Sequence, residues 1–249
     1  MPLTEVADGV HRLEHAYVNV YLVEHEGRLL VVDTGLPGTW RELGDALRRL
    51  GRRPADVAAV VLTHAHFDHT GSAAAFQERL GVPVWLHPED FTIAAHPYRY
   101  AHENVRAVYP LRYPRSLRVL GSMTAAGALR VRGVEGLRPL APGDTLPVPG
   151  NPRVVFTPGH TFGHCALHLP HHDVLICGDA LVTLDPYTGR RGPQIVAGAA
   201  TADSAQALVS LDRLVAYDSG STLLLPGHGD PWSGGVADAV ERARAVGAH

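Results

Sequence analysis

The chain has 249 residues, a formal net charge of −3 and 45% hydrophobic residues, enough to build a substantial core. This charge gives no electrostatic reason to expect nucleic acid or an anionic membrane as a partner. The sequence has no apolar run long enough to cross a bilayer and no basic start followed by an apolar segment, so we expect a cytoplasmic protein. Cys165 and Cys177 are the only cysteines, and we expect buried thiols in neighbouring strands.

Short apolar runs dominate the first third of the chain. Residues 10–33 alternate in character and predict a hairpin or meander of an antiparallel sheet, which ends at Asp33. Residues 39–50 predict an amphipathic helix, because their large apolar residues share one helical face. The apolar run 57–62 then predicts a buried strand, and residues 73–80 predict a helix.

Between that strand and that helix lie three histidines and an aspartate within six residues. His64 and His66 are two residues apart, so in an extended chain both side chains point to the same side and can bind one ion. Asp68 and His69 follow as the chain turns, which places them better for a second ion. Neutral imidazole and carboxylate are the usual ligands of zinc and similar divalent ions. The alternative is a solvated polar loop in a chain that has 16 histidines.

After a predicted strand at 82–86, the segment 88–141 is the least regular part of the sequence. It contains many aromatic and arginine residues, and residues 116–126 could form a helix. Two interpretations remain open for this segment. It forms a substrate pocket, or it is a surface excursion that packs its own tyrosines.

The second half of the chain repeats the plan of the first. Leu30 to Gly35 resembles Leu175 to Asp179 in sequence, which suggests two similar halves that meet at one site and a single domain over residues 1–249. The predicted strands span 145–148, 153–157, 165–169, 174–177 and 221–225, and the predicted helices span 202–217 and 236–246.

Three further ligand-type residues follow apolar, strand-like runs in this half. They are His160, Asp179 and His228, and each has a glycine immediately before it. Glycine lets the backbone turn sharply or approach another group closely. One such histidine is more often a hydrogen-bonded core residue than a ligand, but three sites that share this pattern with the cluster indicate a common centre.

The order HxHxDH, His, Asp, His resembles that of the metallo-β-lactamase fold superfamily, and the similarity extends over residues 10–240 when Asp33 is included. The resemblance implies an α/β (α+β) fold, a four-layer αββα sandwich with two metal ions at one edge. It implies that His64, His66 and His160 bind the first metal, that Asp68, His69 and His228 bind the second, and that Asp179 bridges the pair.

The resemblance also implies roles around the metals. Asp33 would lie near the site and orient a ligand histidine, although from sequence alone it could also cap a turn. The segment 88–141 lies where members of the superfamily vary and often form a wall or lid. The loop 181–200 follows Asp179, and its Tyr187, Arg190 and Arg191 could bind a substrate carboxylate or donate to an oxyanion. The alternative for each of them is a solvated loop residue.

We therefore expect a metal-dependent hydrolase of a small-molecule carboxylic ester, lactone or thioester. Glyoxalase II-like thioesterases and lactonases of the superfamily share this ligand set. Two divalent ions, preferably zinc but with iron or manganese as alternatives, would share a bridging hydroxide as the nucleophile, with Asp68 and Asp179 as the catalytic carboxylates. The second hypothesis is an oxidoreductase that resembles persulfide dioxygenases and uses one iron. The sequence does not indicate the oligomeric state.

Overall fold

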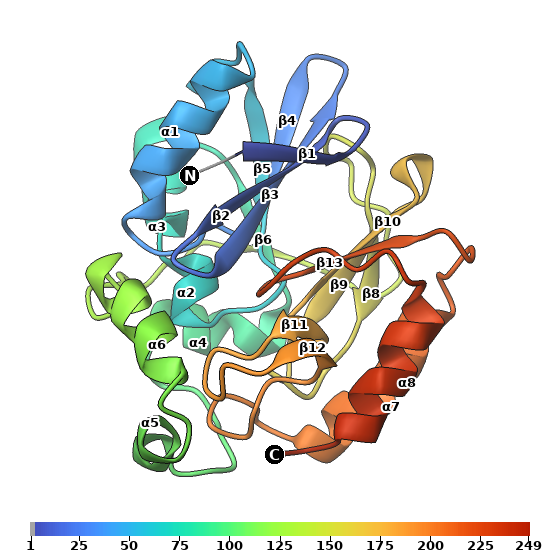
Figure 1. The fold of residues 1–249 in the computed structure, drawn as a ribbon. Helices are drawn as coiled ribbons and strands as arrows, with labels where there is room; N and C mark the ends of the chain where they lie inside the picture. Colours follow the sequence, from blue (N-terminus) through green and yellow to red (C-terminus); the bar gives the residue numbers. More distant parts are fainter. Residues whose placement is uncertain (1–2) are drawn as a thin grey trace.

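Two β-sheets form the centre of the computed structural model, which describes residues 3–249 (Figure 1). The first sheet has seven strands in the order β1 to β7, antiparallel from β1 to β4 and parallel from β4 to β7. Its strands are β1 (Leu3–Ala7), β2 (Val10–His15), β3 (Val18–His25), β4 (Arg28–Val32), β5 (Val57–Val61), β6 (Val84–Leu86) and β7 (Arg138–Pro139).

The second sheet has four strands in the order β13-β10-β9-β8, with β10 parallel to β13. A separate two-stranded sheet pairs β11 with β12. These strands are β8 (Arg153–Phe156), β9 (Cys165–Leu169), β10 (Val174–Gly178), β11 (Val182–Leu184), β12 (Arg191–Gln194) and β13 (Leu223–Pro226).

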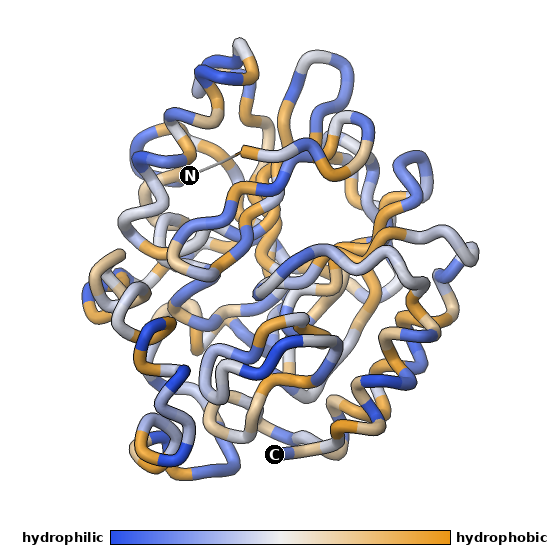
Figure 2. Tube along the Cα trace, in the orientation of Figure 1, coloured by the Kyte–Doolittle hydropathy of each residue, from blue (hydrophilic) through white to orange (hydrophobic). Residues whose placement is uncertain are grey.

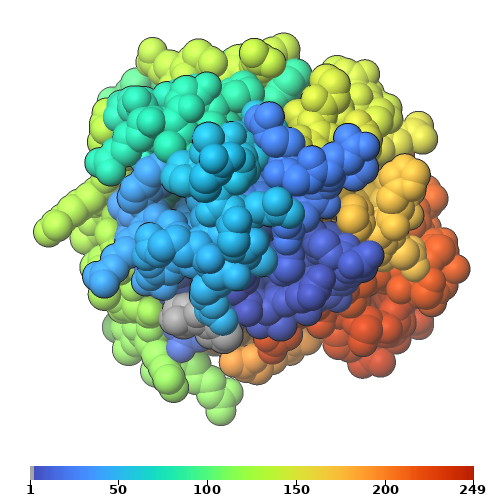
Figure 3. Space-filling model, turned by 90° about the horizontal axis from the view of Figure 1, so that it is seen from above, coloured from blue at the N-terminus to red at the C-terminus, as the bar shows by residue number. Residues whose placement is uncertain are grey.

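Helices cover the outer face of each large sheet. In Figure 1, α1 (Thr39–Arg49) and α3 (Ala73–Leu80) lie on one side of the molecule, and α7 (Ser204–Val215) and α8 (Val236–Val246) lie on the other. From above, the N-terminal part of the chain and its last third occupy different sides of the surface (Figure 3). The order of layers is therefore helix, sheet, sheet, helix, which confirms the predicted sandwich.

Strand β3 shows why both faces of the first sheet are covered. Side chains alternate along a strand, so Val20 and Leu22 pack toward the helices while Tyr21 and Val23 face the second sheet. Both sets are buried, and Figure 2 shows hydrophobic residues concentrated along the central strands. On the other side, Leu175 of β10 belongs to the apolar cluster that α7 and α8 complete. Burial of these apolar side chains is the main favourable contribution to folding.

The segment 88–141 contains short helices that lie beside the two sheets. They are the 3-10 turns Pro88–Asp90 and Arg106–Val108 and the helices α4 (Phe91–Ala95), α5 (Tyr109–Arg112) and α6 (Ser116–Ala125). Helix α6 buries Val119 and Met123 against Val18 and Leu36, so the predicted helix exists and packs on the first half of the chain.

Three local predictions differ from the structure. Residues 145–148 form a single bridge, from Thr145 to Arg153, instead of a strand. The reason is that Pro147 and Pro149 have no amide hydrogen to pair with a neighbouring strand. The loop 181–200 contains the hairpin of β11 and β12, and the edge strand β1 was not predicted.

Within residues 3–249, the structure has no helix that is long and apolar enough to span a membrane. A single domain over residues 1–249 stays a prediction.

A buried asparagine joins the first sheet to the loop after β13. The side-chain amide of Asn19 donates to the carbonyl oxygens of Pro226 and Gly229, each at 2.8 Å. The hydroxyl of Tyr21 also donates to Pro226 O, at 2.7 Å. These bonds fix the backbone on both sides of His228.

The substitution Asn19→Asp keeps the size of this side chain but removes both of its donated hydrogen bonds. We expect the free energy of unfolding to fall by about 2 kcal/mol, because the Pro226 and Gly229 carbonyl groups each lose the hydrogen bond from Asn19 and face a carboxylate oxygen instead. Urea denaturation measures the change. The matched control is Asn151→Asp, the same chemical change at an exposed residue, and equal unfolding midpoints for the two variants would contradict the role of Asn19.

Candidate metal centre

All seven predicted ligands lie on loops or on the first turn of a helix at strand ends. His64 and His66 follow β5, and the short helix α2 (Phe67–Thr70) carries the next two ligands, Asp68 and His69. The remaining three ligands, which lie after β8, β10 and β13, are His160, Asp179 and His228. All seven side chains are buried.

A backbone hydrogen bond brings the two sets of loops together. The amide of Cys165, at the start of β9, donates to the carbonyl oxygen of Thr63 at 2.8 Å. The amide of Gly227 donates to Gly178 O at 2.9 Å, which aligns the ends of β13 and β10. The ligands therefore meet because the ends of strands from both sheets are bonded to each other.

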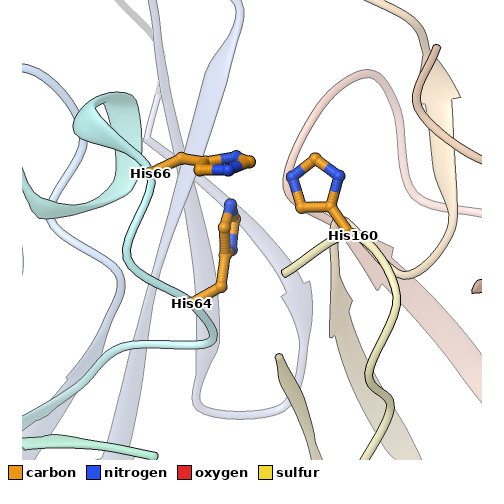
Figure 4. Close-up of side chains that lie close together, drawn as sticks. All are labelled: His64, His66 and His160. Carbon is orange, nitrogen blue, oxygen red and sulfur yellow. The ribbon is translucent and has the colours of Figure 1, made fainter. Parts of the chain in front are cut away.

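The ligand atoms form three overlapping groups, and within each group the atoms lie within 4.8 Å of one another. Figure 4 shows the imidazoles of the first group converging on one point. Asp179 lies between the group that contains His160 and the group that contains His228, with its Oδ2 at 3.4 Å from His160 Nε2 and at 3.3 Å from His228 Nε2. The groups are His64, His66 and His160; His64, His69 and Asp179; and Asp68, His69 and His228.

Several of these atoms are buried and have no hydrogen-bond partner within residues 3–249. They are the Nε2 atoms of His64, His66, His69 and His160, and Oδ1 of Asp179. Buried polar atoms are nearly always paired, so a group of unpaired ligand-type atoms of this kind requires an explanation. Imidazole nitrogens and carboxylate oxygens that converge in this way suit zinc, iron or manganese. The residues present therefore fit a metal centre.

The other ring nitrogen of two histidines is held through Asp33. His69 Nδ1 donates to Asp33 Oδ2 at 3.0 Å, and His64 Nδ1 lies 3.0 Å from Thr63 Oγ1, which in turn donates to Asp33. Asp33 has a φ of 59°, an uncommon conformation for a residue other than glycine. These contacts are the ones that the predicted orienting role of Asp33 requires, since they leave Nε2 directed at the centre.

Two more histidines are oriented in the same way. His160 Nδ1 lies 3.3 Å from Thr201 Oγ1, and His228 Nδ1 donates to the backbone oxygen of Tyr17 at 2.7 Å. The Tyr17 contact links the second half of the chain to the turn before β3. A ring held at Nδ1 presents a fixed Nε2 to a metal ion.

The protonation of His64, His66 and His160 differs from that of His228. Burial lowers the pKa of His64 and His66 well below the usual value and lowers the pKa of His160 to about 4. Burial also lowers the pKa of His228, but the carboxylates of Asp179 and Asp68 outweigh burial and raise it to about 10. The imidazoles of His64, His66 and His160 are therefore neutral in the metal-free protein, whereas the group of Asp68, His69 and His228 carries positive charge that balances its carboxylates.

A cavity lies beside the ligands. Its apolar and aromatic wall comes from α2, α6, the segment 88–141 and the loop after β11, and the ring of Tyr100 lies 4.1 Å from that of His66. Burial raises the pKa of Tyr187 well above 10, so its hydroxyl stays protonated and is a donor. The residues that line the cavity outside the ligands include Phe67, Tyr100, Leu120, Met123, Pro186, Tyr187 and Val196.

Only one of the three predicted substrate-binding residues lies at the cavity. Tyr187 lines the cavity, whereas neither Arg190 nor Arg191 is among the residues that line it. The side chain of Arg191 is 70% exposed and lies 3.8 Å from Asp230. The substrate-binding role of the two arginines stays a prediction.

Sequence reasoning missed His164, which supports the backbone of Asp179. His164 Nε2 accepts a hydrogen bond from the Asp179 amide at 3.0 Å, and its Nδ1 donates to Thr157 Oγ1 at 2.8 Å. Burial lowers the pKa of His164 to about 3, which keeps Nε2 free to accept. The signal that could have found it is the second histidine, four residues after His160.

A family model described as the metallo-beta-lactamase superfamily matches residues 14–228. The chain belongs to this superfamily. The match covers every predicted ligand, and it confirms the family and the fold that the sequence predicted.

The individual relatives are distant in sequence, and the similarity extends over most of each chain. The chain is 28% identical to the probable metallo-hydrolase YflN of Bacillus subtilis, over 94% of this chain and 92% of that protein. It is 26% identical to an N-acyl homoserine lactonase of a Bacillus species, over 78% of this chain and 73% of that protein. A crystal structure of TTHA1623 in a di-iron-bound form aligns with a TM-score of 0.63 and 27% identity, over 93% of this chain and 96% of that chain.

Metal binding at neutral pH should release protons. With a pKa of about 10, His228 is protonated in the metal-free protein, and a metal ligand must be a neutral imidazole. We expect about one or two protons per chain to be released, from His228 and from His69, whose pKa is also raised. Calorimetric titration with zinc in buffers of different ionisation enthalpy counts them. The same apparent enthalpy in every buffer would contradict the predicted protonation.

Proposed function

We propose that this chain is a hydrolase that uses two divalent metal ions, preferably zinc, to cleave a carboxylic ester, lactone or thioester bond. The observation that carries the proposal is the set of buried ligand atoms that converge without partners among residues 3–249. The unpaired atoms belong to His64, His66, His69, His160 and Asp179, and Asp68 and His228 lie in the same cluster of possible ligands. His64, His66 and His160 would hold the first ion, Asp68, His69 and His228 the second, and Asp179 would bridge them.

When bound, two such ions supply a hydroxide nucleophile at neutral pH and polarise the carbonyl group that it attacks. The protein fixes the geometry through hydrogen bonds such as that from His69 to Asp33. Asp68 and Asp179 are the proposed catalytic carboxylates, because both are buried at the cluster and face His228 Nε2 at 3.3 Å. Burial alone would raise the pKa of both carboxyl groups, but the neighbouring histidines outweigh it and lower the pKa, so both stay ionised and would accept a hydrogen bond from the attacking water.

The apolar residues that line the cavity favour a substrate with an uncharged, partly apolar acyl group. Phe67, Leu120 and Met123 form one wall and exclude water from the reacting carbonyl. Tyr187 lines the same cavity, and its protonated hydroxyl can donate to the oxyanion or to the leaving oxygen. Similarity to a homoserine lactonase supports including lactones among the candidate substrates.

The substitution Asp179→Ala should remove the bridge between the two metal groups. We expect the wild-type chain to contain about two metal ions and to hydrolyse at least one lactone, ester or thioester in a metal-dependent way, and we expect the variant to lose most metal and activity. Plasma mass spectrometry and a substrate screen with and without a chelator measure both. The matched control is Asp144→Ala, at an exposed carboxylate.

A fully active and fully metallated Asp179→Ala protein would contradict the proposal. One iron per chain in the wild type, with little other metal, would instead support the dioxygenase-like alternative. Oxygen consumption with a persulfide substrate would then be the assay that decides.

The substitution Tyr187→Phe should lower kcat/KM by about 100-fold on the substrate that the screen identifies, with the metal content unchanged, because one donor to the oxyanion is lost. Tyr217→Phe is the control, since Tyr217 packs on His168 away from the cavity. Steady-state kinetics measure the effect, and equal values for the two variants would remove Tyr187 from the proposal. The same assay on Arg190→Gln and Arg191→Gln tests the predicted role of the two arginines.

A further inference from the structure

Asp90 is a buried carboxylate that neither the ligand set nor the cavity includes. It is the last residue of the turn Pro88–Asp90, directly before α4, and its relative exposure is 0%. Its Oδ2 accepts hydrogen bonds from the Ala65 amide at 3.0 Å and from Thr161 Oγ1 at 2.7 Å. Its Oδ1 accepts from the Gly163 amide at 2.9 Å.

These three donors belong to the two loops that carry the first metal group. Ala65 lies between His64 and His66, and Thr161 directly follows His160. One carboxylate therefore holds the backbone of both loops at the point where three imidazoles converge. It comes from a third part of the chain, the start of the segment 88–141.

A role in starting helix α4 does not account for Asp90. Asp90 occupies the N-cap position of α4, but its side chain makes no capping hydrogen bond there. Its two oxygens are used by the two loops instead. Burying a carboxylate is costly unless hydrogen-bond donors stabilise it, and the three donors that stabilise this one all belong to the two loops.

The local geometry also requires an acceptor without hydrogens. Three donors share two oxygens, so an amide in place of the carboxylate would direct its NH2 group at one of the donors. The approach is close, because a Cβ added at Gly163 would lie 2.7 Å from Asp90 Oδ1. Glycine at position 163 is what allows the carboxylate to reach this amide.

We propose that Asp90 is a positioning residue for the first metal group. It holds the loop of His64 and His66 at a fixed distance from the loop of His160, and it acts through Ala65, Thr161 and Gly163 without touching a ligand atom. This inference rests on the proposed metal centre.

The test is cobalt(II) titration of the wild type, Asp90→Asn and Thr161→Val, followed by the visible absorption of the bound ion. The wild type should bind two ions. In Asp90→Asn the dissociation constant for cobalt at the group of His64, His66 and His160 should rise at least tenfold, and the spectrum of the ion bound there should change. The group of Asp68, His69 and His228 should still bind cobalt. Thr161→Val removes one of the three hydrogen bonds and should give a smaller rise, of about threefold to tenfold.

The control is Asp173→Asn, which makes the same change in a carboxylate that is also held by several hydrogen bonds. Asp173 precedes β10 and accepts hydrogen bonds from Ser219, Ser221 and Thr222, which precede β13, so these bonds lie at the ends of the two strands opposite the cluster. This variant should lose stability but keep the cobalt affinity and spectrum of the wild type, which separates positioning from general stability.

Wild-type affinity and spectrum in Thr161→Val and in Asp90→Asn would overturn the inference. If Asp90→Asn does not fold, Thr161→Val decides alone, because it loses only a hydroxyl group. A wild type that binds no cobalt would overturn the proposed metal centre, whereas a wild type that binds two ions with unaffected variants overturns only the role of Asp90.

Discussion

Seven ligand-type side chains are buried where the ends of strands from two sheets meet, and their convergence is the constraint on which the rest of the structure depends. Desolvating imidazoles and carboxylates is unfavourable unless each finds a partner. Here Nε2 of His64, His66 and His160 has none within residues 3–249. These residues fit a metal centre, and we propose that a divalent cation is the partner that satisfies all of these atoms together.

Around these atoms, a second layer of hydrogen bonds determines where each ligand points. Asp33 is shared by the loops of His64 and His69, His164 holds the Asp179 backbone, and Asp90 joins the two loops of the first group. Most of these bonds connect residues that are far apart in the sequence. The site is therefore a property of the assembled sandwich, since neither sheet alone positions a complete group.

The sequence predicted the parts of the site that obey a local pattern. The cluster from His64 to His69 is contiguous, and His160, Asp179 and His228 each follow a strand and a glycine. The longer helices α1, α3, α6, α7 and α8 and most strands were predicted for the same reason, because their apolar residues recur with a regular period. These features need no knowledge of what packs against them.

The rest could not be predicted because it depends on contacts between distant segments. The donors to Asp90 lie 25, 71 and 73 residues away, and two of them are backbone amides that no residue type reveals. Strand β1 is a half-exposed edge strand with little apolar alternation. Residues 145–148 look like a strand by composition, but Pro147 and Pro149 prevent regular pairing there.

Anomalous X-ray diffraction from crystals of the metal-loaded protein tests the central claim most directly. Data collected above the absorption edge of the bound metal locate each ion and identify its element. The account predicts two peaks, one among His64, His66 and His160 and one among Asp68, His69 and His228, with Asp179 between them. A single peak, or none at these residues, would contradict the dinuclear centre.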